Sequence, residues 1–348
     1  MSRKIFVTFL IIVTACISCS DTIDTRIEEE QQLADGQQKG DPVTGGVWSA
    51  VTAVGTARKG AAAAAEGNLI YIYGGKCESG YLNEFFSYDV NSGITAVLVN
   101  DIPRAYSAME VVNGYLYIVA GENSSGPLVE LKSYDVAHSS WSASYTVSQT
   151  NGPWPPESSH YSVLHYTNPD NGHDELFYIG VDDTSSGVPS SFLYKLDISN
   201  SPKPKWYQLT AGPSVINHGF AVAGNSLYVF GGYDVSAHSY SNKLWKYSIV
   251  SDSWEYIITT APPAPRSEMT LEILHDALYV FGGRDDTQFF SDMWRVTTNG
   301  EWKEIAGAPD ARAGYVSFVS GSDIFYYGGY TTDAGVEIYY NTLWKYTP

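Results

Sequence analysis

The chain has 348 residues, of which 44% are hydrophobic and 17% are charged, so it can build a substantial core and is not a disordered protein. Its 20 basic and 38 acidic residues give a formal net charge of −18 at pH 7. Because this negative field repels phosphate groups, it excludes a general binder of nucleic acid or of anionic membranes. The 32 glycines and 27 tyrosines favour short strands joined by turns.

Residues 1–19 are expected to be a lipoprotein signal peptide. A basic start precedes an apolar run, Ile5 to Ala15, that is too short to span a bilayer. A small residue before a cysteine resembles the lipobox of bacterial lipoproteins, whose cysteine is acylated. Cys16 fits that pattern better than Cys19, because Val13 lies three residues upstream of Cys16; an ordinary cleaved signal is the alternative. We therefore expect a protein of the bacterial cell envelope, either periplasmic or surface-exposed, that meets the membrane only through its lipid anchor.

Residues 20–46 are expected to form a flexible linker. The segment is polar, acidic and almost free of aromatic residues, so it cannot bury enough apolar surface to order itself. The globular domain is expected to cover residues 47–348. Cys77 is the single cysteine beyond the anchor region, so no disulfide can form inside this domain.

A repeat of about 50 residues runs through the domain. Six strand-like apolar runs end in a glycine pair or its relic, at positions 74–75, 120–121, 179–180, 231–232, 282–283 and 328–329. Five are followed by two mostly aromatic positions: Tyr88 and Ile94, Tyr134 and Trp141, Leu196 and Trp206, Tyr247 and Trp254, and Trp294 and Trp302. Each repeat has room for four strands of five to six residues.

Four repeats carry an arginine ahead of the apolar run: Arg58, Arg104, Arg266 and Arg312. The last repeat ends near Tyr346 without an outer aromatic strand, whereas Trp48 supplies one at the other end of the domain. A strand around Trp48 is therefore expected to complete the last unit, which closes a ring and removes exposed strand edges.

The glycine pairs with their downstream Tyr and Trp positions resemble the kelch repeat over residues 47–348. This resemblance implies an all-β fold, a six-bladed kelch β-propeller of four-stranded antiparallel blades. The residue types agree with that fold, because glycines permit close backbone turns and large rings fill the space between twisted sheets.

Antiparallel geometry places the arginine entries and the loops after the glycine pairs on one face. Aromatic rings and charged groups there could stack on sugars and grip hydroxyls or a carboxylate. The predicted ligand-binding residues are Arg58, Arg104, Tyr106, Asn217, Tyr233, Arg266, Arg284, Arg312, Tyr315 and Tyr330. The predicted catalytic residues, if the protein is an enzyme, are Glu268, His218 and His160. The repeated arginines have a structural alternative, in which they tie neighbouring loops together.

Two enzyme families with kelch propellers resemble the chain more distantly. Arg104-Ala105-Tyr106 is similar to the entry of the galactose oxidase central domain, but Lys59 stands near the place of that family's cross-linking cysteine and Asn217 replaces its second tyrosine ligand. We therefore expect no copper oxidase activity. Resemblance to six-bladed bacterial sialic-acid mutarotases implies Glu268 as an acid/base, an arginine such as Arg284 or Arg266 for the substrate carboxylate, and a histidine sharing proton transfer.

The fold alone does not assign an activity. The expected function is binding of a glycan or an envelope protein. The alternatives are a mutarotase or epimerase for N-acetylneuraminate or a related acidic sugar, and a scaffold subunit of an envelope complex. No metal, cofactor or nucleic-acid partner is expected.

Overall fold

The computed structural model describes residues 46–128, 130–142, 144–145, 150–156, 161–182, 189–199, 203–296, 300–305 and 307–348. The predicted signal peptide, both candidate lipidation cysteines Cys16 and Cys19, the linker up to residue 45, and His160 lie outside these residues. The chain divides into Met1–Thr44 and Gly45–Pro348, and the fold below belongs to the second unit. Within the described part, no helix is long and apolar enough to cross a membrane.

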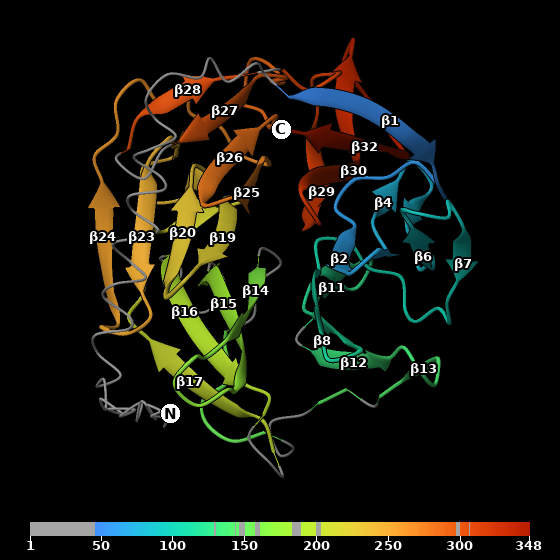
Figure 1. Ribbon diagram of the computed structural model, residues 1–348, viewed down its shortest axis with the longest axis vertical. Coiled ribbons are helices and arrows are strands. Elements are labelled where there is room, and N and C mark those ends of the chain that lie inside the picture. The colour runs from blue at the N-terminus through green and yellow to red at the C-terminus, as the bar shows by residue number, and fades with distance from the viewer. Residues whose placement is uncertain are drawn as a thin grey trace, which may run out of the picture. The chain divides into compact units, whose positions relative to one another are not determined.

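Five four-stranded antiparallel sheets, and a sixth in which β31 (Val336–Tyr339) adds to four such strands, form the frame of this unit and are here called blades 1 to 6 (Figure 1). Blade 1 contains β2 (Ala62–Glu66), β3 (Leu69–Tyr73), β6 (Phe85–Asp89) and β7 (Thr95–Val97), and blade 2 contains β8 (Ala108–Val112), β9 (Tyr115–Val119), β12 (Leu131–Asp135) and β13 (Ser140–Trp141). Blade 3 contains β14 (Ser162–Thr167), β15 (Asp174–Asp182), β16 (Ser190–Asp197) and β17 (Lys205–Leu209), and blade 4 contains β19 (Gly219–Ala223), β20 (Ser226–Phe230), β23 (Leu244–Ser248) and β24 (Ser253–Ile257). Blade 5 contains β25 (Thr270–Leu274), β26 (Ala277–Phe281), β27 (Met293–Val296) and β28 (Trp302–Glu304), and blade 6 contains β29 (Ala313–Ser320), β30 (Asp323–Asp333), β32 (Thr342–Thr347) and β1 (Val47–Ala53).

The first strand of each blade is the innermost one. These strands contact one another in a closed cycle, β2 to β8, β14, β19, β25, β29 and back to β2, around a central channel. The prediction of an all-β propeller is therefore confirmed.

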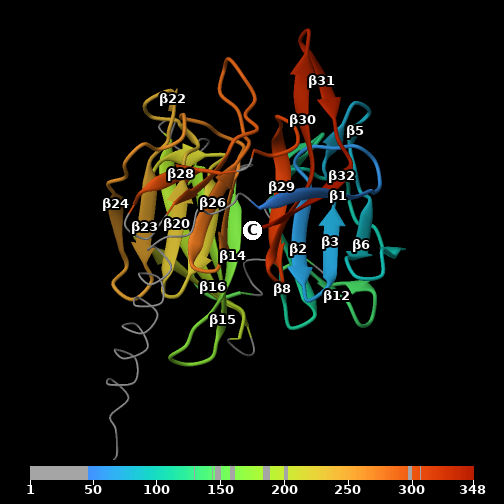
Figure 2. The same cartoon turned by 45° about the horizontal axis from the view of Figure 1, so that its top comes forward.

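Short strands after the glycine pairs stand on one end of the ring. They are β4 (Lys76–Cys77) with β5 (Gly80–Tyr81), β10 (Glu122–Asn123) with β11 (Gly126–Pro127), β21 (Tyr233–Asp234) with β22 (Ser239–Tyr240) and β18 (Val215–Ile216), and β31 (Val336–Tyr339) with the end of β30. Figure 2 shows β5, β22 and β31 at the same end. Isolated bridges join the arginine entries to these loops, for example Lys59 to Lys76 and Ser267 to Arg284, so both segments share one face as expected.

The ring is closed by the expected N-terminal strand. Strand β1 pairs with β32, and Trp48 lies opposite Tyr346. The Trp48 ring packs 5.0 Å from the Tyr346 ring and 5.3 Å from the Tyr326 ring, measured between centroids. The N-terminal strand thus completes blade 6 through both backbone pairing and aromatic packing.

A row of large side chains crosses each blade and packs against the preceding blade. In blade 4 the row reads Val222, Leu227, Tyr247 and Trp254 along paired strands. In four blades the residue that this row takes from the third strand is a tyrosine: Tyr88, Tyr134, Tyr247 and Tyr346. In blade 3 it is Leu196, and in blade 5 it is Val296. The prediction of Trp294 at this place in blade 5 was wrong, because Val296 is the residue that pairs with Leu278 and Trp302.

Candidate functional site

A belt of backbone hydrogen bonds surrounds one entrance of the channel. Its members lie two positions after the arginine place of each blade, and the described members are Gly60, Tyr106, Asn217, Glu268 and Gly314. Four of these amides donate to the carbonyl of the member in the preceding blade: Tyr106 to Gly60 at 2.7 Å, Gly60 to Gly314 at 2.8 Å, Gly314 to Glu268 at 3.1 Å and Glu268 to Asn217 at 2.8 Å. The belt therefore links neighbouring blades directly at the entrance.

All described belt residues adopt the left-handed backbone region, with φ between 52° and 63°. Glycine and asparagine tolerate this conformation, but it is unfavourable for Tyr106 and Glu268. Non-glycine residues held in this way concentrate at functional sites. Tyr106 and Glu268 are therefore the two belt residues whose side chains call for an explanation beyond the fold.

Glu268 forms an ion pair with Arg284 from the loop after the glycine pair of blade 5. The Arg284 Nε donates to Glu268 Oε1 at 2.7 Å, and the two side chains are 32% and 15% exposed. The Tyr330 hydroxyl lies 3.4 Å from the same oxygen. Desolvation lowers the pKa of Arg284, but the negative charge and the hydrogen bond of Glu268, with smaller contributions from Tyr330 and Tyr240, together raise that pKa above its ordinary value, so the guanidinium stays charged.

Two aromatic rings and a lysine complete this entrance. A Cβ on Gly60 would lie 2.7 Å from the Tyr106 ring, and a Cβ on Gly314 would lie 3.2 Å from the Tyr330 ring, so both rings cover belt glycines. The Lys59 Nζ lies 4.1 Å from the centroid of Tyr330 and 2.5 Å from Glu337. We call Lys59, Tyr106, Glu268, Arg284 and Tyr330 the mouth.

The mouth is a charged and aromatic surface of blades 5, 6, 1 and 2. Burial, followed by the charge of Glu268, raises the pKa of Tyr106 and of Tyr330, so both phenols remain protonated hydrogen-bond donors at neutral pH. The half-buried Tyr106 ring, beside fixed opposite charges, can stack on a sugar, and the charges can bond its hydroxyls or a carboxylate. Tyr330 is only 5% exposed and packs against Phe289 and Lys59, so its predicted stacking contact with ligand is corrected.

A polar rim on the same face links the loops of neighbouring blades. The Tyr240 hydroxyl donates to Asp286 at 2.7 Å, and the Tyr81 hydroxyl donates to Glu122 at 2.8 Å. Burial and the acceptor carboxylate raise the pKa of each of these tyrosines to about 12. Tyr233, predicted to bind ligand, packs edge-on against Tyr240 and is half-buried in this rim.

The four repeated arginines do not belong to the mouth, which corrects the ligand-binding role predicted for them. Arg58, Arg104, Arg266 and Arg312 are at most 2% exposed. Each donates from Nη1 to the carbonyl of the residue 16 positions later, which opens its own glycine-pair motif. Each also pairs with a carboxylate, Glu84, Glu130, Asp292 or Asp310 respectively. These arginines hold each blade entry to its second strand and cannot meet a ligand.

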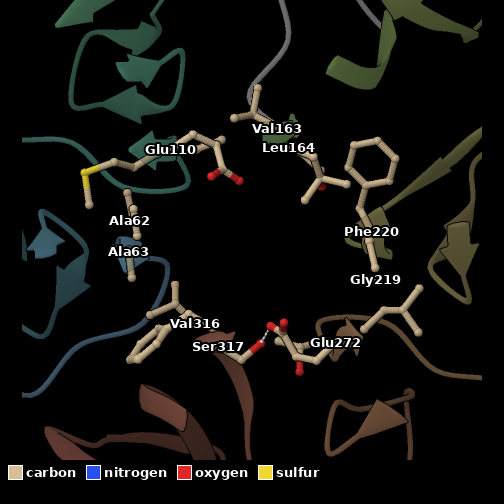
Figure 3. Close-up of a pocket in the computed structure, with 18 of the residues that line it drawn as sticks. Ala62, Ala63, Glu110, Val163, Leu164, Gly219, Phe220, Glu272, Val316 and Ser317 are labelled. Atoms are coloured by element: carbon tan, nitrogen blue, oxygen red, sulfur yellow. Dashed lines mark hydrogen bonds between the residues drawn. The ribbon is translucent and has the colours of Figure 1, made fainter. Parts of the chain in front are cut away.

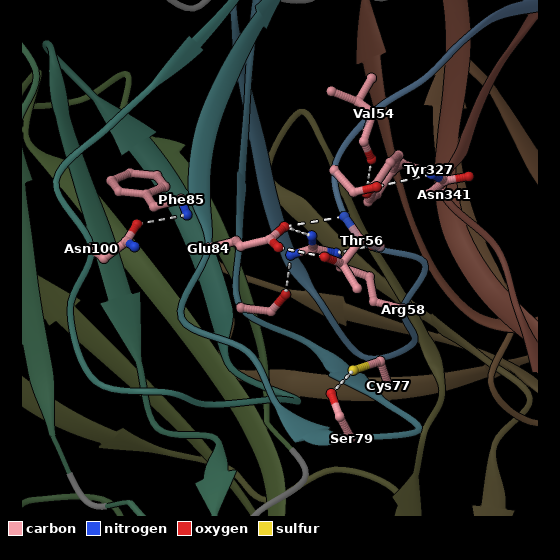
Figure 4. Close-up of polar contacts among 12 residues, drawn as sticks. Val54, Thr56, Arg58, Cys77, Ser79, Glu84, Phe85, Asn100, Tyr327 and Asn341 are labelled. Atoms are coloured by element: carbon pink, nitrogen blue, oxygen red, sulfur yellow. Dashed lines mark hydrogen bonds and ion pairs between the residues drawn. The ribbon is translucent and has the colours of Figure 1, made fainter.

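Figure 4 shows this arrangement around Arg58, which lies between Glu84 and Thr56. The Thr56 amide also donates to Glu84 at 3.1 Å. Nearby, Cys77 is buried and unpaired with any cysteine in the described chain, and its sulfur lies 3.1 Å from the Ser79 hydroxyl. The polar groups around Arg58 are thus arranged for packing inside the blade.

Three further predicted residues occupy other places. Tyr315 is buried, and its hydroxyl donates to the Phe281 carbonyl, so its predicted contact with ligand is also corrected. His218 is buried in the channel wall, with Nδ1 3.1 Å from the Val215 carbonyl. Asn217 contributes its backbone to the belt. Among the predicted catalytic residues, Glu268 contacts a predicted ligand-binding arginine, Arg284.

Behind the mouth, the innermost strands enclose a channel cavity of about 420 Å³. Ser107, Met269 and Tyr315, which directly follow Tyr106, Glu268 and Gly314 in the chain, line it. Most of the remaining wall consists of Ala, Val, Leu, Ile and Phe side chains from the six inner strands (Figure 3). The cavity lining therefore begins one residue beyond three members of the belt.

Two carboxylates that sequence reasoning missed project into this cavity from different sides, Glu110 from β8 and Glu272 from β25 (Figure 3). Ser317 donates a hydrogen bond to Glu272. Burial, with the charge of Glu272 second, raises the pKa of Glu110 to about 8, and burial raises the pKa of Glu272 to about 7. Their position in the repeat could have revealed them. Both lie six residues after a repeated arginine, where the other two arginine-bearing blades have the apolar residues Ala64 and Phe318.

The described residues contain no group of three or more His, Cys, Asp or Glu side chains that could hold a metal ion.

The closed ring of four-stranded antiparallel sheets, with a polar mouth over its channel, defines a β-propeller. Residues 171–348, half of the chain, match the KLHDC2/KLHL20/DRC7 Kelch-repeats domain family. The chain therefore belongs to the kelch-repeat family.

Several known proteins are similar to parts of the chain. Kelch domain-containing protein 3 of Homo sapiens is 27% identical over 50% of this chain and 48% of its own length. The chain thus spans about half the length of that relative. Tip elongation aberrant protein 1 of Schizosaccharomyces pombe is 29% identical over 56% of this chain and 17% of its own. A solved structure described as "Structure of YjhT" covers 84% of this chain and 96% of its own, with a TM-score of 0.68 at 14% identity, which is a likeness of fold.

Proposed function

We propose that this propeller is a binding module that holds a glycan at the mouth. The observation that carries the proposal is the partly exposed Glu268–Arg284 pair, which lies on the belt near the half-buried Tyr106 ring. A sugar presents apolar ring faces to aromatic groups and hydroxyls to charged ones, so it matches this surface. Rigid frames that carry variable loops are typical of recognition proteins.

The binding proposal is tested by calorimetry of the purified protein against a panel of neutral and acidic glycans. Arg284→Ala and Glu268→Gln are expected to weaken binding at least tenfold, since each removes one half of the ion pair. Lys303→Ala is the matched control, because Lys303 is an exposed cation on the outer strand β28. Binding that survives both mouth substitutions, or that falls equally in Lys303→Ala, would contradict the proposal.

A mutarotase is the second candidate, and the same pair favours it. Glu268 could exchange a proton with the anomeric hydroxyl or ring oxygen of an acidic sugar while Arg284 holds the sugar's carboxylate. NMR exchange between the anomers of N-acetylneuraminate measures this activity. Acceleration that is lost in Glu268→Gln supports the enzyme, whereas binding without acceleration supports the module alone.

A scaffold in an envelope complex is the remaining alternative. It predicts no glycan binding and co-purification of an envelope protein whose recovery is reduced by Arg284→Ala. The scaffold alternative is contradicted if the pull-down recovers no envelope protein and the purified chain binds a glycan saturably.

We also propose that the protein is anchored at the cell envelope through a lipidated cysteine. The proposal rests on the apolar run before Cys16 and Cys19. Metabolic labelling with an alkyne fatty acid should mark the wild-type chain and Cys19→Ala but not Cys16→Ala. Labelling lost in Cys19→Ala instead would reassign the site, and absence of label in the wild type would refute the anchor.

A further inference from the structure

The interface between blades 4 and 5 contains a cavity of about 270 Å³. Its apolar walls come from Tyr228, Leu244 and Ile257 of blade 4 and from Ile273, Leu278 and Val296 of blade 5. It is distinct from the channel cavity, with which it shares one lining residue, Ile273 of the inner strand β25. Well-packed proteins contain few spaces of this size between neighbouring sheets.

The cavity lies where other blades place a tyrosine. Tyr88, Tyr134, Tyr247 and Tyr346 hold the third-strand place of the cross-blade row and are at most 5% exposed against the preceding blade. Blade 5 has Val296 at this place, paired with Leu278 exactly as Tyr247 is paired with Leu227. Valine lacks the ring that fills the other interfaces, so the space beside Val296 stays open.

The other blade without this tyrosine closes its interface by another route. In blade 3 the place is held by Leu196, but Trp206 is buried there and packs 4.8 Å from Tyr178 and 5.7 Å from Trp154. The cavity lined by these residues is only about 20 Å³. At the interface of blades 4 and 5 Trp302 packs on Phe230 at 4.9 Å, yet the larger cavity remains. The missing ring is therefore compensated in blade 3 and not in blade 5.

Polar side chains stand at the edge of the cavity. Lys246 and Glu255 form an ion pair at 3.3 Å with side chains 34% and 64% exposed, and Asp276 is exposed beside them. In blade 4, the equivalent tyrosine ring ends in a hydroxyl that donates to Asp252 at 2.7 Å. An apolar slot with acceptors at its edge suits a ring that carries one hydroxyl.

We infer that this interface is a binding site for a small phenol, whose ring takes the place of the tyrosine that blade 5 lacks. The ring packs against Val296 and Leu278, and the hydroxyl donates to a carboxylate at the edge. This site is independent of the mouth, and it stands or falls separately from the proposed function.

The test uses the full chain and p-cresol. This compound is the tyrosine side chain with Cβ as a methyl group. We expect saturable binding in ligand-detected NMR, and intermolecular NOEs from the cresol ring to the methyl groups of Val296, Leu278 and Ile273. Val296→Tyr and Val296→Phe each fill the cavity and should weaken binding at least tenfold. p-Toluenesulfonate, an anion of similar shape, should also bind at least tenfold more weakly, because a sulfonate has no proton to donate to the carboxylates of Glu255 and Asp276.

Tyr247→Val is the matched gain-of-site variant, since it removes the same ring from the interface of blades 3 and 4. We expect it to bind a second equivalent of p-cresol. The inference is overturned if the wild-type chain shows no saturable binding, if the NOEs to Val296 and Leu278 are missing, or if a folded Val296→Tyr or Val296→Phe binds as tightly as the wild type. The NOE measurement decides the question in the wild-type chain even if these variants do not fold.

Discussion

Two arginines of blade 5, only 18 residues apart, are used in opposite ways. Arg266 is fully buried and bonds to the Gly282 carbonyl at 3.0 Å and to both oxygens of Asp292. Arg284 is 32% exposed and shares one hydrogen bond with Glu268 at the mouth. The first holds the blade together and the second is available to a ligand. Repetition in the sequence marks the structural arginine, and departure from the repeat marks the functional candidate.

The same division separates the interior of the ring from its entrance. Burial by itself raises the pKa of Asp292, but the hydrogen bonds and charge of Arg266 outweigh it and lower that pKa, so the buried pair is ionised. Breaking such a pair leaves an uncompensated buried charge. An exposed pair such as Glu268 with Arg284 contributes much less to stability because water screens it.

The largest expected effect comes from Arg266→Ala. It should lower the free energy of unfolding by about 3 kcal/mol, because the buried Gly282 carbonyl and the half-buried Asp292 both lose their partner. Arg284→Ala is the matched control and should cost less than about 1 kcal/mol. Urea unfolding of both variants measures the difference, and equal losses would contradict the division between the two arginines.

A middle-sized effect is expected from the channel carboxylates. Folding raises the pKa of Glu110 to about 8 and of Glu272 to about 7 from the ordinary value of 4.5. Between pH 4.5 and 8 the folded state therefore binds more protons than the unfolded state, so stability falls as pH rises through this window. The loss should be on the order of 1–2 kcal/mol, because both side chains are only half-buried and solvent screens them in part.

The double variant Glu110→Gln, Glu272→Gln cannot titrate at these positions. Its free energy of unfolding should stay nearly constant across the same window, and chemical denaturation at several pH values measures it. Carboxylates with lowered pKa, such as Asp292, destabilise the fold only at more acidic pH, outside the window. A wild-type chain that gains stability between pH 5 and 8 would refute the assignment.

The smallest expected effect is a gain of stability from Glu268→Gly. Glycine relieves the left-handed backbone at φ 55°, while the loss of the exposed pair with Arg284 offsets part of that gain. We expect unfolding to become about 0.5 kcal/mol more costly and ligand binding to be lost. Thermal unfolding compared with Glu268→Gln, which keeps the strained backbone, isolates the contribution of the conformation. A less stable glycine variant would show that the mouth carries no strain.

The sequence predicted the propeller well because its determinants are local and repeated. Glycine pairs, the cross-blade rings and the terminal position of Trp48 all follow from a period of about 50 residues, and the β1–β32 pairing confirmed the closure. The sequence prediction was wrong at Trp294, because Val296 holds the expected place. The two residues are two positions apart and point to the same face of the sheet, so the alternating pattern of a strand cannot distinguish them.

The candidate site was only partly predictable. Glu268 and Arg284 stood out because the repeat does not require them, and the structure joins them. Three of the four buried arginines have their carboxylate 26 residues later, as Arg58 has Glu84, and no local pattern links such residues; Arg312 instead uses Asp310. Glu110 and Glu272 belong to different blades and share one cavity only because the ring closes.

The closure also has a temporal consequence. Lys59 and Tyr106 belong to the first two blades, and Glu268, Arg284 and Tyr330 to the last two, so the mouth straddles the seam where β1 meets β32. Pairing segments almost 300 residues apart is a slow, entropically costly event that comes late in folding. A nascent chain can therefore shape individual blades early, yet it gains its recognition surface only when the seam has joined.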